Sequence, residues 1–315
     1  MKINILKEKL KKGLNIVEKI SQKSLKLPIL QNILFKTEKD LLKLSTTNLE
    51  SSISWQSLAD IEKEGSICIP TKILSSFVNS LPEEKIAINT DKKNNLKVQC
   101  GNYNTKIKSL DSEDFPIIPQ IENGQEITVN NKEFCEAVNQ IVNIPSSSST
   151  KPEITGILFS FQKDQIKMVA TDSFRLAEKK ISVKTGLSED YSLILPQSAA
   201  KELTGILSGE EGDLKIKFSP NQISFNYILN KTSKSEVKFT SRLVEGKYPN
   251  YKEIIPEEYK TTLIVDKDKF LNQVKSASLF SGKINEVKLD IKKKDKKIKI
   301  SSQHPDLGEH ESFLE

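Results

Sequence analysis

The chain has 315 residues, of which 36% are hydrophobic and 29% charged, and its formal net charge is +6. This length allows two or three domains with cores of their own, and no apolar run has the length of a membrane span or a signal peptide. The mild positive charge permits an anionic partner but does not require one. Cys68, Cys100 and Cys135 lack the spacing of a metal site, so we expect reduced core thiols in a cytoplasmic protein without metal or cofactor.

Five segments have the apolar spacing of amphipathic helices, and alternating runs between them predict antiparallel strands with one solvated face. In the first helix, Leu6, Leu10, Leu14 and Val17 form the apolar stripe, and most lysines lie off it. The other helices are expected at about 71–80, 131–142, 197–207 and 267–280. Pro70 and Pro196 precede two of these helices, where a missing N–H costs nothing.

The chain also repeats itself. Asn32–Asn48 aligns without a gap on Gly156–Asp172, and a weaker third copy begins at Val287 and continues through Ile298-Lys-Ile. A short predicted strand and a helix precede each copy, starting at Ile3, Ile127 and Leu263. Self-similarity at a long period indicates one domain used several times. We therefore predict an α+β fold of tandem domains at 1–126, 127–257 and 258–315, the last containing only the first half of a unit.

Little in the sequence favours catalysis. The phosphate-binding pattern Gly-x4-Gly-Lys-Ser/Thr is absent. His304 and His310 have acidic neighbours, but they follow a predicted strand in a Pro-containing loop, and a solvated loop is a better interpretation than a metal site. Ser198-Ala-Ala-Lys201, Ser224-Phe-Asn226 and Lys184-Thr-Gly186 match short acyl-transferase motifs. The third motif precedes the other two, against the order of that enzyme class, so this alternative is weak.

Lysines on or beside the predicted helices form a candidate phosphate-binding surface. They could form an ordinary solvated face, or a surface that follows phosphates without reading sequence. Glu133 and Glu136 on the helix at 131–142 argue against a uniformly basic surface. The DNA-facing candidates are Lys9, Lys12, Lys23, Lys72, Lys201, Lys267 and Lys275.

Four motifs together resemble one family. They are Val169-Ala-Thr-Asp-Ser-Phe-Arg-Leu-Ala177, Ser241-Arg-Leu-Val-Glu-Gly-Lys-Tyr-Pro-Asn-Tyr251, Leu27-Pro-Ile-Leu-Gln-Asn-Ile-Leu34 and Asp114-Phe-Pro116. In this order they are similar to the bacterial DNA polymerase III β subunit, the β sliding clamp. The resemblance implies a non-enzymatic ring around double-stranded DNA, with sheets outside and helices lining the hole. Such a ring tethers the replicative polymerase and clamp-loader subunits to DNA through short peptide motifs.

The resemblance also implies a peptide pocket between the second and third domains. Apolar residues around one arginine suit an extended peptide with hydrophobic anchors. The family often has histidine where Phe174 stands, so the pocket's polarity is expected to differ. Ala170-Thr171-Asp172 is also expected to form a strand-end turn, as at Thr46-Thr47-Asn48. The matching positions are Ile154, Thr171, Ser173, Phe174, Arg175, Leu176, Pro249 and Ile254.

Ring closure in the family is implied to join two subunits head to tail. Ile107 matches one side of that interface, and Leu279 and Phe280 match the other. We expect a full third unit to need about 50 further residues, in keeping with ordinary domain size, and the chain as given to lack part of the interface and of the pocket. A scaffold that binds only peptides and does not encircle DNA is the remaining alternative.

Overall fold

Alternating apolar and polar residues form the strands of four antiparallel sheets in the computed structural model, which describes residues 1–21, 27–91, 95–146, 150–292 and 297–314. The chain divides into two compact units, Met1–Pro249 and Asn250–Glu315. The first unit contains two copies of the predicted repeat. We call the copy with the Asn32–Asn48 hairpin the first repeat and the copy with the Gly156–Asp172 hairpin the second repeat.

The first unit holds three of the sheets, and each repeat has one sheet of its own. The sheet of the first repeat has the order β5-β1-β7-β8-β9, and that of the second has the order β13-β12-β11-β14. The strands of the first are β1 Lys2–Leu6, β5 Asp60–Lys63, β7 Lys85–Thr90, β8 Leu96–Cys100 and β9 Tyr103–Ile107. The strands of the second are β11 Gly156–Phe161, β12 Gln165–Thr171, β13 Leu176–Ser182 and β14 Tyr191–Pro196.

The third sheet, which we call the shared sheet, runs through both repeats. Its order is β10-β15-β16-β17-β4-β3-β2-β6. The repeats join where β17 pairs with β4, with Val237 opposite Trp55 and Phe239 opposite Ile53. Its strands are β2 Asn32–Glu38, β3 Leu41–Thr47, β4 Ser51–Leu58, β6 Gly65–Pro70, β10 Gln125–Asn130, β15 Asp213–Phe218, β16 Gln222–Asn230 and β17 Ser235–Arg242.

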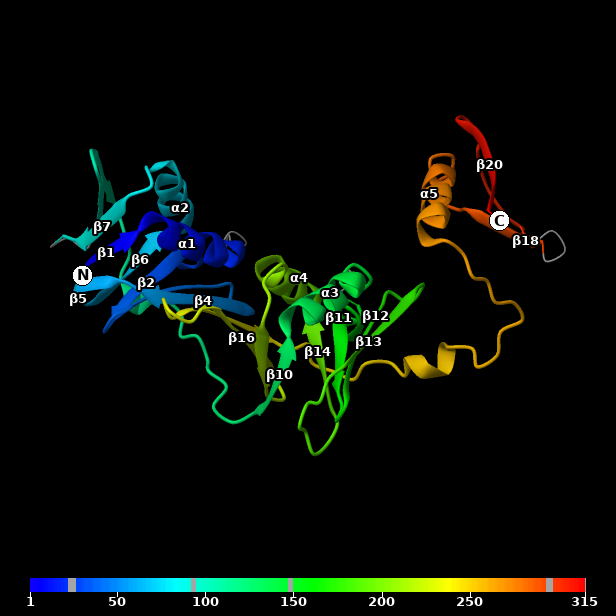
Figure 1. The fold of residues 1–315 in the computed structure, drawn as a ribbon, viewed down its shortest axis with the longest axis horizontal. Coiled ribbons are helices and arrows are strands. Elements are labelled where there is room, and N and C mark those ends of the chain that lie inside the picture. Colours follow the sequence, from blue (N-terminus) through cyan, green and yellow to red (C-terminus); the bar gives the residue numbers. More distant parts are fainter. Residues whose placement is uncertain (22–26, 92–94, 147–149, 293–296, 315) are drawn as a thin grey trace. The chain divides into compact units, whose positions relative to one another are not determined.

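Four helices belong to the first unit, two from each repeat, and all four were predicted from apolar spacing. In the view of Figure 1 they lie along the upper side of this unit. Pro70 and Pro196 are the last residues of the preceding strands and stand immediately before their helices. The helices are α1 Lys7–Ser21, α2 Thr71–Ser80, α3 Asn131–Ile141 and α4 Gln197–Leu207. Three short 3-10 helices accompany them: η1 Pro28–Gln31, η2 Ser112–Asp114 and η3 Pro152–Ile154.

The predicted apolar stripe of α1 is wrong at its first position. Leu6 is the last residue of β1 and is 46% exposed, whereas Lys7 is only 6% exposed. The helix starts directly from the strand, so its buried stripe begins at Leu10. Lys7 tolerates burial because its Nζ donates to the Leu81 carbonyl and lies 2.8 Å from Glu83 Oε1.

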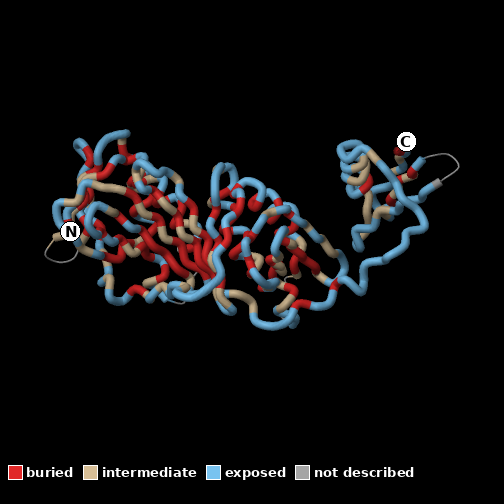
Figure 2. The backbone as a smooth tube through the Cα atoms, turned by 60° about the horizontal axis from the view of Figure 1, so that its bottom comes forward, coloured by how far each residue is buried: buried red, intermediate tan, exposed pale blue. Residues whose placement is uncertain are grey.

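A continuous apolar core runs through both repeats, as the buried backbone in Figure 2 shows. In the second repeat it includes stacked rings, with the centroids of Phe134 and Phe159 5.9 Å apart. Cys68, Cys100 and Cys135 are buried and free, which confirms the prediction of core thiols. Burial is the main cause that raises the pKa of Cys68 and of Cys135 to about 12.

The second unit is smaller. It contains the 3-10 helix η4 Tyr251–Ile254, the predicted helix α5 Lys267–Ser278, and the strands β18 Lys288–Lys292, β19 Lys297–His304 and β20 Gly308–Leu314. Its core consists of Ala277, Ile298, Ile300 and Leu314. The expected hairpin of the third copy is therefore confirmed in its two strands.

Two sequence predictions fail in the second unit. No strand forms at Leu263–Val265, because no strand among the described residues of this unit lies beside it, whereas β1 and β10 each have a pairing partner. His310 is not in a loop: it lies in β20 and stacks on Phe280 with ring centroids 6.0 Å apart. The reason is that the chain reverses at residues 305–307 and forms a further strand.

Candidate functional site

The turn between β12 and β13 carries four of the predicted peptide-site residues. The Thr171 hydroxyl donates to the Arg175 carbonyl at 2.8 Å and accepts from the Ser173 amide at 3.1 Å. Asp172 Oδ1 accepts from the Phe174 and Arg175 amides at 3.0 and 2.9 Å. These bonds hold Ser173 at a φ of 76°, a conformation that needs such support in a residue other than glycine.

The turn presents an aromatic ring and a fixed cation. Phe174 is 98% exposed. Arg175 Nε lies 3.1 Å from Asp172 Oδ2, and its Nη2 donates to the Asn143 carbonyl at 3.1 Å. The guanidinium is thus held at both ends while its side chain stays 61% exposed. An exposed ring beside a positioned cation suits a ligand with an apolar anchor and a carbonyl or carboxylate group.

The remaining predicted wall residues differ widely in exposure. Ile154 ends η3 and is 3% exposed, so its side chain offers almost no surface that a ligand could contact. Leu176 is half-buried and Pro249 is exposed. Ile254 is 69% exposed and belongs to the second compact unit, at the end of η4.

Sequence reasoning missed three residues that support this turn. Asp172 and Asn143 position Arg175, and Tyr248 is buried immediately before Pro249. Burial raises the pKa of Tyr248 to about 12, so its hydroxyl stays protonated. The signal for Asp172 was available, since an Asp followed by Ser is typical of a turn in which the side chain accepts from nearby amides. Nothing in the sequence around Asn143 pointed to Arg175.

Six of the seven predicted DNA-facing lysines are described by the structure; these six lie on helices, and not all of them are free. Lys12 Nζ on α1 is 3.3 Å from Glu210 Oε1, and the nearby Lys19 donates to the Gly205 carbonyl. Lys72 on α2 and Lys201 on α4 are exposed. In the second unit, Lys267 and Lys275 are exposed on α5. Lys23, from the first unit, lies outside the described residues.

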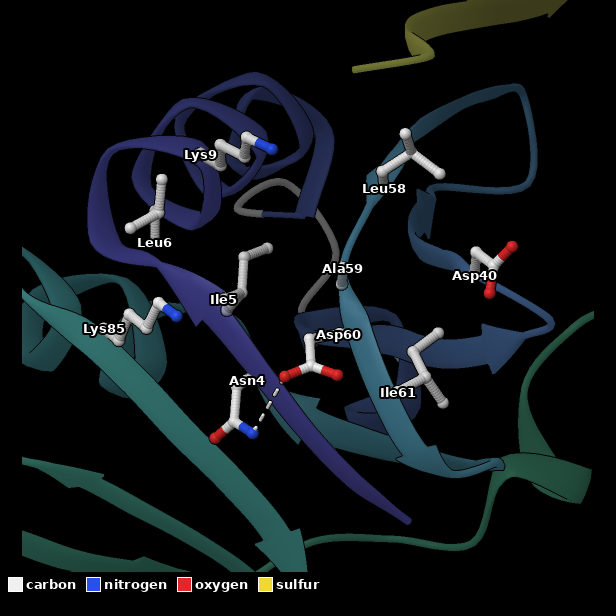
Figure 3. A pocket seen from close by; sticks show the side chains of 10 residues that line it. All are labelled: Asn4, Ile5, Leu6, Lys9, Asp40, Leu58, Ala59, Asp60, Ile61 and Lys85. Atoms are coloured by element: carbon white, nitrogen blue, oxygen red, sulfur yellow. Dashed lines mark hydrogen bonds between the residues drawn. The ribbon is translucent and has the colours of Figure 1, made fainter. Parts of the chain in front are cut away.

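Lys9 has a different setting. It lines a hollow of about 490 Å³ between the start of α1 and the β4–β5 segment (Figure 3). Asp40 and Asp60 line the same hollow, and Asp60 Oδ2 accepts from Asn4 Nδ2 at 3.4 Å. The hollow beside Lys9 therefore has acidic as well as basic lining.

The predicted subunit-interface residues are also unequal. Leu279 is 71% exposed, and Phe280 is half-buried against His310. Ile107 ends the edge strand β9, but its side chain belongs to the core and is only 4% exposed. At this position the backbone edge of β9 offers more to a partner than the side chain does.

Within the part of the chain that the structure describes, no three His, Cys, Asp or Glu side chains gather as metal ligands. None of the described helices combines the length and apolarity needed to cross a membrane.

Comparison with known proteins assigns the whole arrangement to one family. Three domain models of the DNA polymerase III beta subunit match in order: the N-terminal domain at residues 1–119, the central domain at 128–250 and the C-terminal domain at 252–315. A Bacillus subtilis (strain 168) protein named Beta sliding clamp is 29% identical over 320 residues, covering 98% of this chain and 82% of the relative.

Two further relatives agree. A Beta sliding clamp of Staphylococcus aureus (strain Mu50 / ATCC 700699) is 28% identical over 292 residues, covering 90% of this chain and 75% of the relative. The crystal structure of the DNA polymerase sliding clamp from Bacillus subtilis has a TM-score of 0.91 at 27% identity, covering 100% of this chain and 83% of that one. The chain belongs to the DNA polymerase III beta subunit family, the beta sliding clamps.

Proposed function

We propose that this chain is a DNA sliding clamp, the non-catalytic processivity factor of a replicative DNA polymerase, acting in the bacterial cytoplasm. The observation that carries the proposal is the ordered match of all three clamp-domain models to one chain. The acyl-transferase alternative is dropped, because the family is not enzymatic. We further propose domains at residues 1–126, 127–257 and 258–315, and a head-to-tail homodimer in which Ile107 lies on one side and Leu279 and Phe280 on the other.

The proposed contact with duplex DNA is diffuse and electrostatic. Lys72 and Lys201 are exposed on helices of different repeats, and Lys267 and Lys275 on the helix of the second unit. Lysines of this kind contact phosphates without reading base sequence. Lys12 contributes less, because Glu210 lies 3.3 Å from its ammonium group.

Retention on DNA of different topology tests the ring. After loading onto nicked circular plasmid, the protein is expected to stay bound at high salt and to leave when the plasmid is linearised. The double variant Lys72→Glu, Lys201→Glu is expected to bind DNA more weakly at low salt and to depend less on salt, since each lost phosphate contact makes the salt slope shallower by about 0.9. Lys180→Glu on β13 is the matched control, as Lys180 pairs with Glu178 at 3.0 Å. Equal retention on circular and linear plasmid would contradict encirclement.

We also propose that the Thr171–Leu176 turn, with Ile154 and Pro249, binds short peptides of the polymerase and the clamp loader. The exposed Phe174 ring and the held Arg175 guanidinium support this assignment. An extended peptide with apolar anchors would cover the ring, and its polar backbone or carboxylate would meet the guanidinium.

Fluorescence anisotropy with a labelled polymerase C-terminal peptide tests the peptide site. Phe174→Ala and Arg175→Ala are each expected to weaken binding about tenfold or more, the size expected for a central contact. Phe174→Ala should not change the melting temperature, because its side chain is exposed, and Arg175→Ala should lower it only slightly, because the ion pair that it removes is a surface pair. Glu50→Ala, at the position of the first repeat that corresponds to Phe174, is the matched control. If it weakens peptide binding as much as Phe174→Ala does, the site has been misplaced.

A further inference from the structure

The outer face of the shared sheet has a recess of about 320 Å³ that the clamp function leaves unexplained. Strands β2, β3, β4 and β17 form its floor, and Phe115–Gln120, which connects the two repeats, closes one side. Alternate residues of a strand point to opposite faces. Ile53 and Trp55 of β4 face the core, so Ser52 and Ser54 face the recess.

Three lysines line this recess. Lys36 stands opposite Lys43 across β2 and β3, and Lys238 comes from β17. Ser54 on β4 stands opposite Lys238, so the cations come from both repeats and converge over β4. Lys238 is half-buried, and its pKa is lowered first by burial and then by the positive charge of Lys43. Like charges held together in a partly desolvated place leave room for a compensating anion.

Hydroxyl groups between the lysines are short of partners. Ser52 and Thr240 stand opposite each other in the β4–β17 pair and are only 7% and 8% exposed. Among the described residues, neither side-chain hydroxyl has a hydrogen-bond partner. Ser45 and Ser54 share one hydrogen bond of 2.9 Å, which leaves one of their two protons free to donate. Neither oxygen is among the fully buried, unpaired side-chain oxygens of the described residues, so both hydroxyls are accessible to a ligand in the recess.

The carboxylates near the recess are already engaged. Glu38 is the lining carboxylate, and its Oε2 lies 3.4 Å from Lys36 Nζ. Glu236 precedes Lys238 on the same face of β17, where its negative charge partly offsets the lowering of the Lys238 pKa, and it accepts a hydrogen bond of 3.1 Å from Gln56 Nε2. Lys43 and Lys238 have no ion-pair partner among the described residues. The recess thus offers donors and positive charge in excess of acceptors.

We propose that this recess binds a small inorganic oxyanion of the phosphate class, such as phosphate or diphosphate. Lys43 and Lys238 supply the charge, and the hydroxyls of Ser52, Thr240 and the Ser45–Ser54 pair donate to its oxygens. Ammonium groups and hydroxyls are the side chains that bind phosphate oxygens in proteins. A volume near 320 Å³ is at the small end of ligand pockets, which favours a free anion over a larger phosphate ester.

Titration calorimetry of the full 315-residue chain with inorganic pyrophosphate tests the proposal, with chloride at matched ionic strength as the reference. Saturable binding of one anion per chain is expected. Lys238→Gln is expected to weaken it at least about tenfold, the effect of losing one charge-assisted contact. Lys215→Gln on β15 removes the same charge from the same sheet outside the recess and is expected to leave the affinity unchanged. Equal losses in the two variants, or no saturable binding, would overturn the proposal.

Thr240→Val separates binding from folding. Valine keeps the shape of threonine and removes a hydroxyl that has no hydrogen-bond partner among the described residues, so the melting temperature should stay nearly the same. Pyrophosphate affinity is nevertheless expected to fall several-fold. An unchanged affinity in this variant would exclude the hydroxyl as a ligand contact and contradict the site as drawn. ADP is expected to bind more weakly than pyrophosphate; tighter binding of ADP would contradict the small-anion assignment.

Discussion

The hairpin turns of the two repeats are built from the same hydrogen bonds but carry different side chains. In the first repeat the Thr47 hydroxyl donates to the Ser51 carbonyl at 2.9 Å. In the second repeat Thr171 makes the same bond to Arg175 at 2.8 Å. Both turns close at the end of the second strand of their hairpin, at positions that align without a gap.

The likeness extends to backbone strain and to the residue after the threonine. Leu49 and Ser173 have φ values of 75° and 76°. The side chains of Asn48 and Asp172 each accept from two following amides, at 3.0 and 2.7 Å in the first turn and 3.0 and 2.9 Å in the second. The turn is therefore a structural element of the repeat, and its presence says nothing about peptide binding.

What differs is what the turns present. Glu50 and Ser51 of the first repeat stand where the second repeat has Phe174 and Arg175. Only the second turn has an acid–base pair, between Asp172 and Arg175. The backbone of the turn is therefore the same in both repeats. The proposed peptide contacts depend on Phe174 and Arg175, which only the second repeat has.

The largest effect is expected inside the repeats, at Gly13. A Cβ at this position would lie 2.5 Å from Cε3 of Trp55, and a buried indole ring cannot move aside. Gly13→Ala is therefore expected to lower the free energy of unfolding by about 2–3 kcal/mol, the usual cost of overpacking. In the second repeat, Ala137 aligns with Gly13 and Lys179 aligns with Trp55. Ala137→Gly should cost about 1 kcal/mol, the helix propensity of glycine. Urea unfolding measures both, and the opposite ranking would refute the packing argument.

The next effect is expected at the threonines of the turns. Thr47→Val and Thr171→Val each remove a hydroxyl that donates to a carbonyl and accepts from an amide. Each is expected to cost about 1–2 kcal/mol of unfolding free energy. Only Thr171→Val should also weaken the labelled peptide, because it loosens the backbone that carries Phe174. Thermal unfolding and anisotropy on the same samples distinguish the two effects. A loss of peptide affinity in Thr47→Val would mean that the turns are not functionally distinct.

A smaller effect is expected from relieving backbone strain. Leu49→Gly and Ser173→Gly place glycine at a positive φ that it adopts without steric cost. The relief, on the order of 1–2 kcal/mol, exceeds the extra flexibility that glycine gives the unfolded chain, about 0.5–1 kcal/mol. Each variant should thus gain about 0.5 kcal/mol. A clear loss in the urea midpoint at either position would show that the side chain matters more than the backbone.

The smallest effect is expected from acid. The Arg175 amide, then the Phe174 amide and the Arg175 guanidinium, hold the pKa of Asp172 below its ordinary 3.8. A depressed pKa stabilises the fold above that ordinary value, and this stabilisation is lost as the pH falls through the lower folded value. The second turn should therefore loosen at a pH below 3.8, whereas the first, built on Asn48, has no such group. Amide exchange at residues 173–175 and 49–51 measures this. Asp172→Asn should remove the pH dependence, and its persistence would assign it to another group.

The regular elements could be predicted because their signals are local. Apolar spacing located all five helices, and the aligned hairpins predicted the strand pairs and the turn at Thr171. The predictions failed where contacts between residues distant in the sequence determine the structure. Lys7 can be buried because its ammonium group donates a hydrogen bond to the Leu81 carbonyl and pairs with Glu83, both of which are far away in the sequence. The apolar run Leu263–Val265 has the composition of a strand but no pairing partner in the described part of its unit.

Tertiary contacts also decided what the sequence could not say about the sites. Arg175 was predicted, but the Asn143 carbonyl that holds it is 32 residues away in the sequence. The family resemblance predicted Ile107 as a residue of the subunit interface, whereas its side chain lies in the core. No feature of β4 or β17 indicates that they pair with each other, because either alternating pattern would suit any antiparallel neighbour.

The pairing of β17 with β4 has a consequence for solubility. Each of these eight-residue strands would be the open edge of its own repeat if the repeats were separate. An open edge of this length is a template for other chains, and proteins protect such edges by charge, bulges or cover. Here each repeat covers the other. Separating the two repeats would expose both edges at once, so the junction protects this protein from self-association through its own strands.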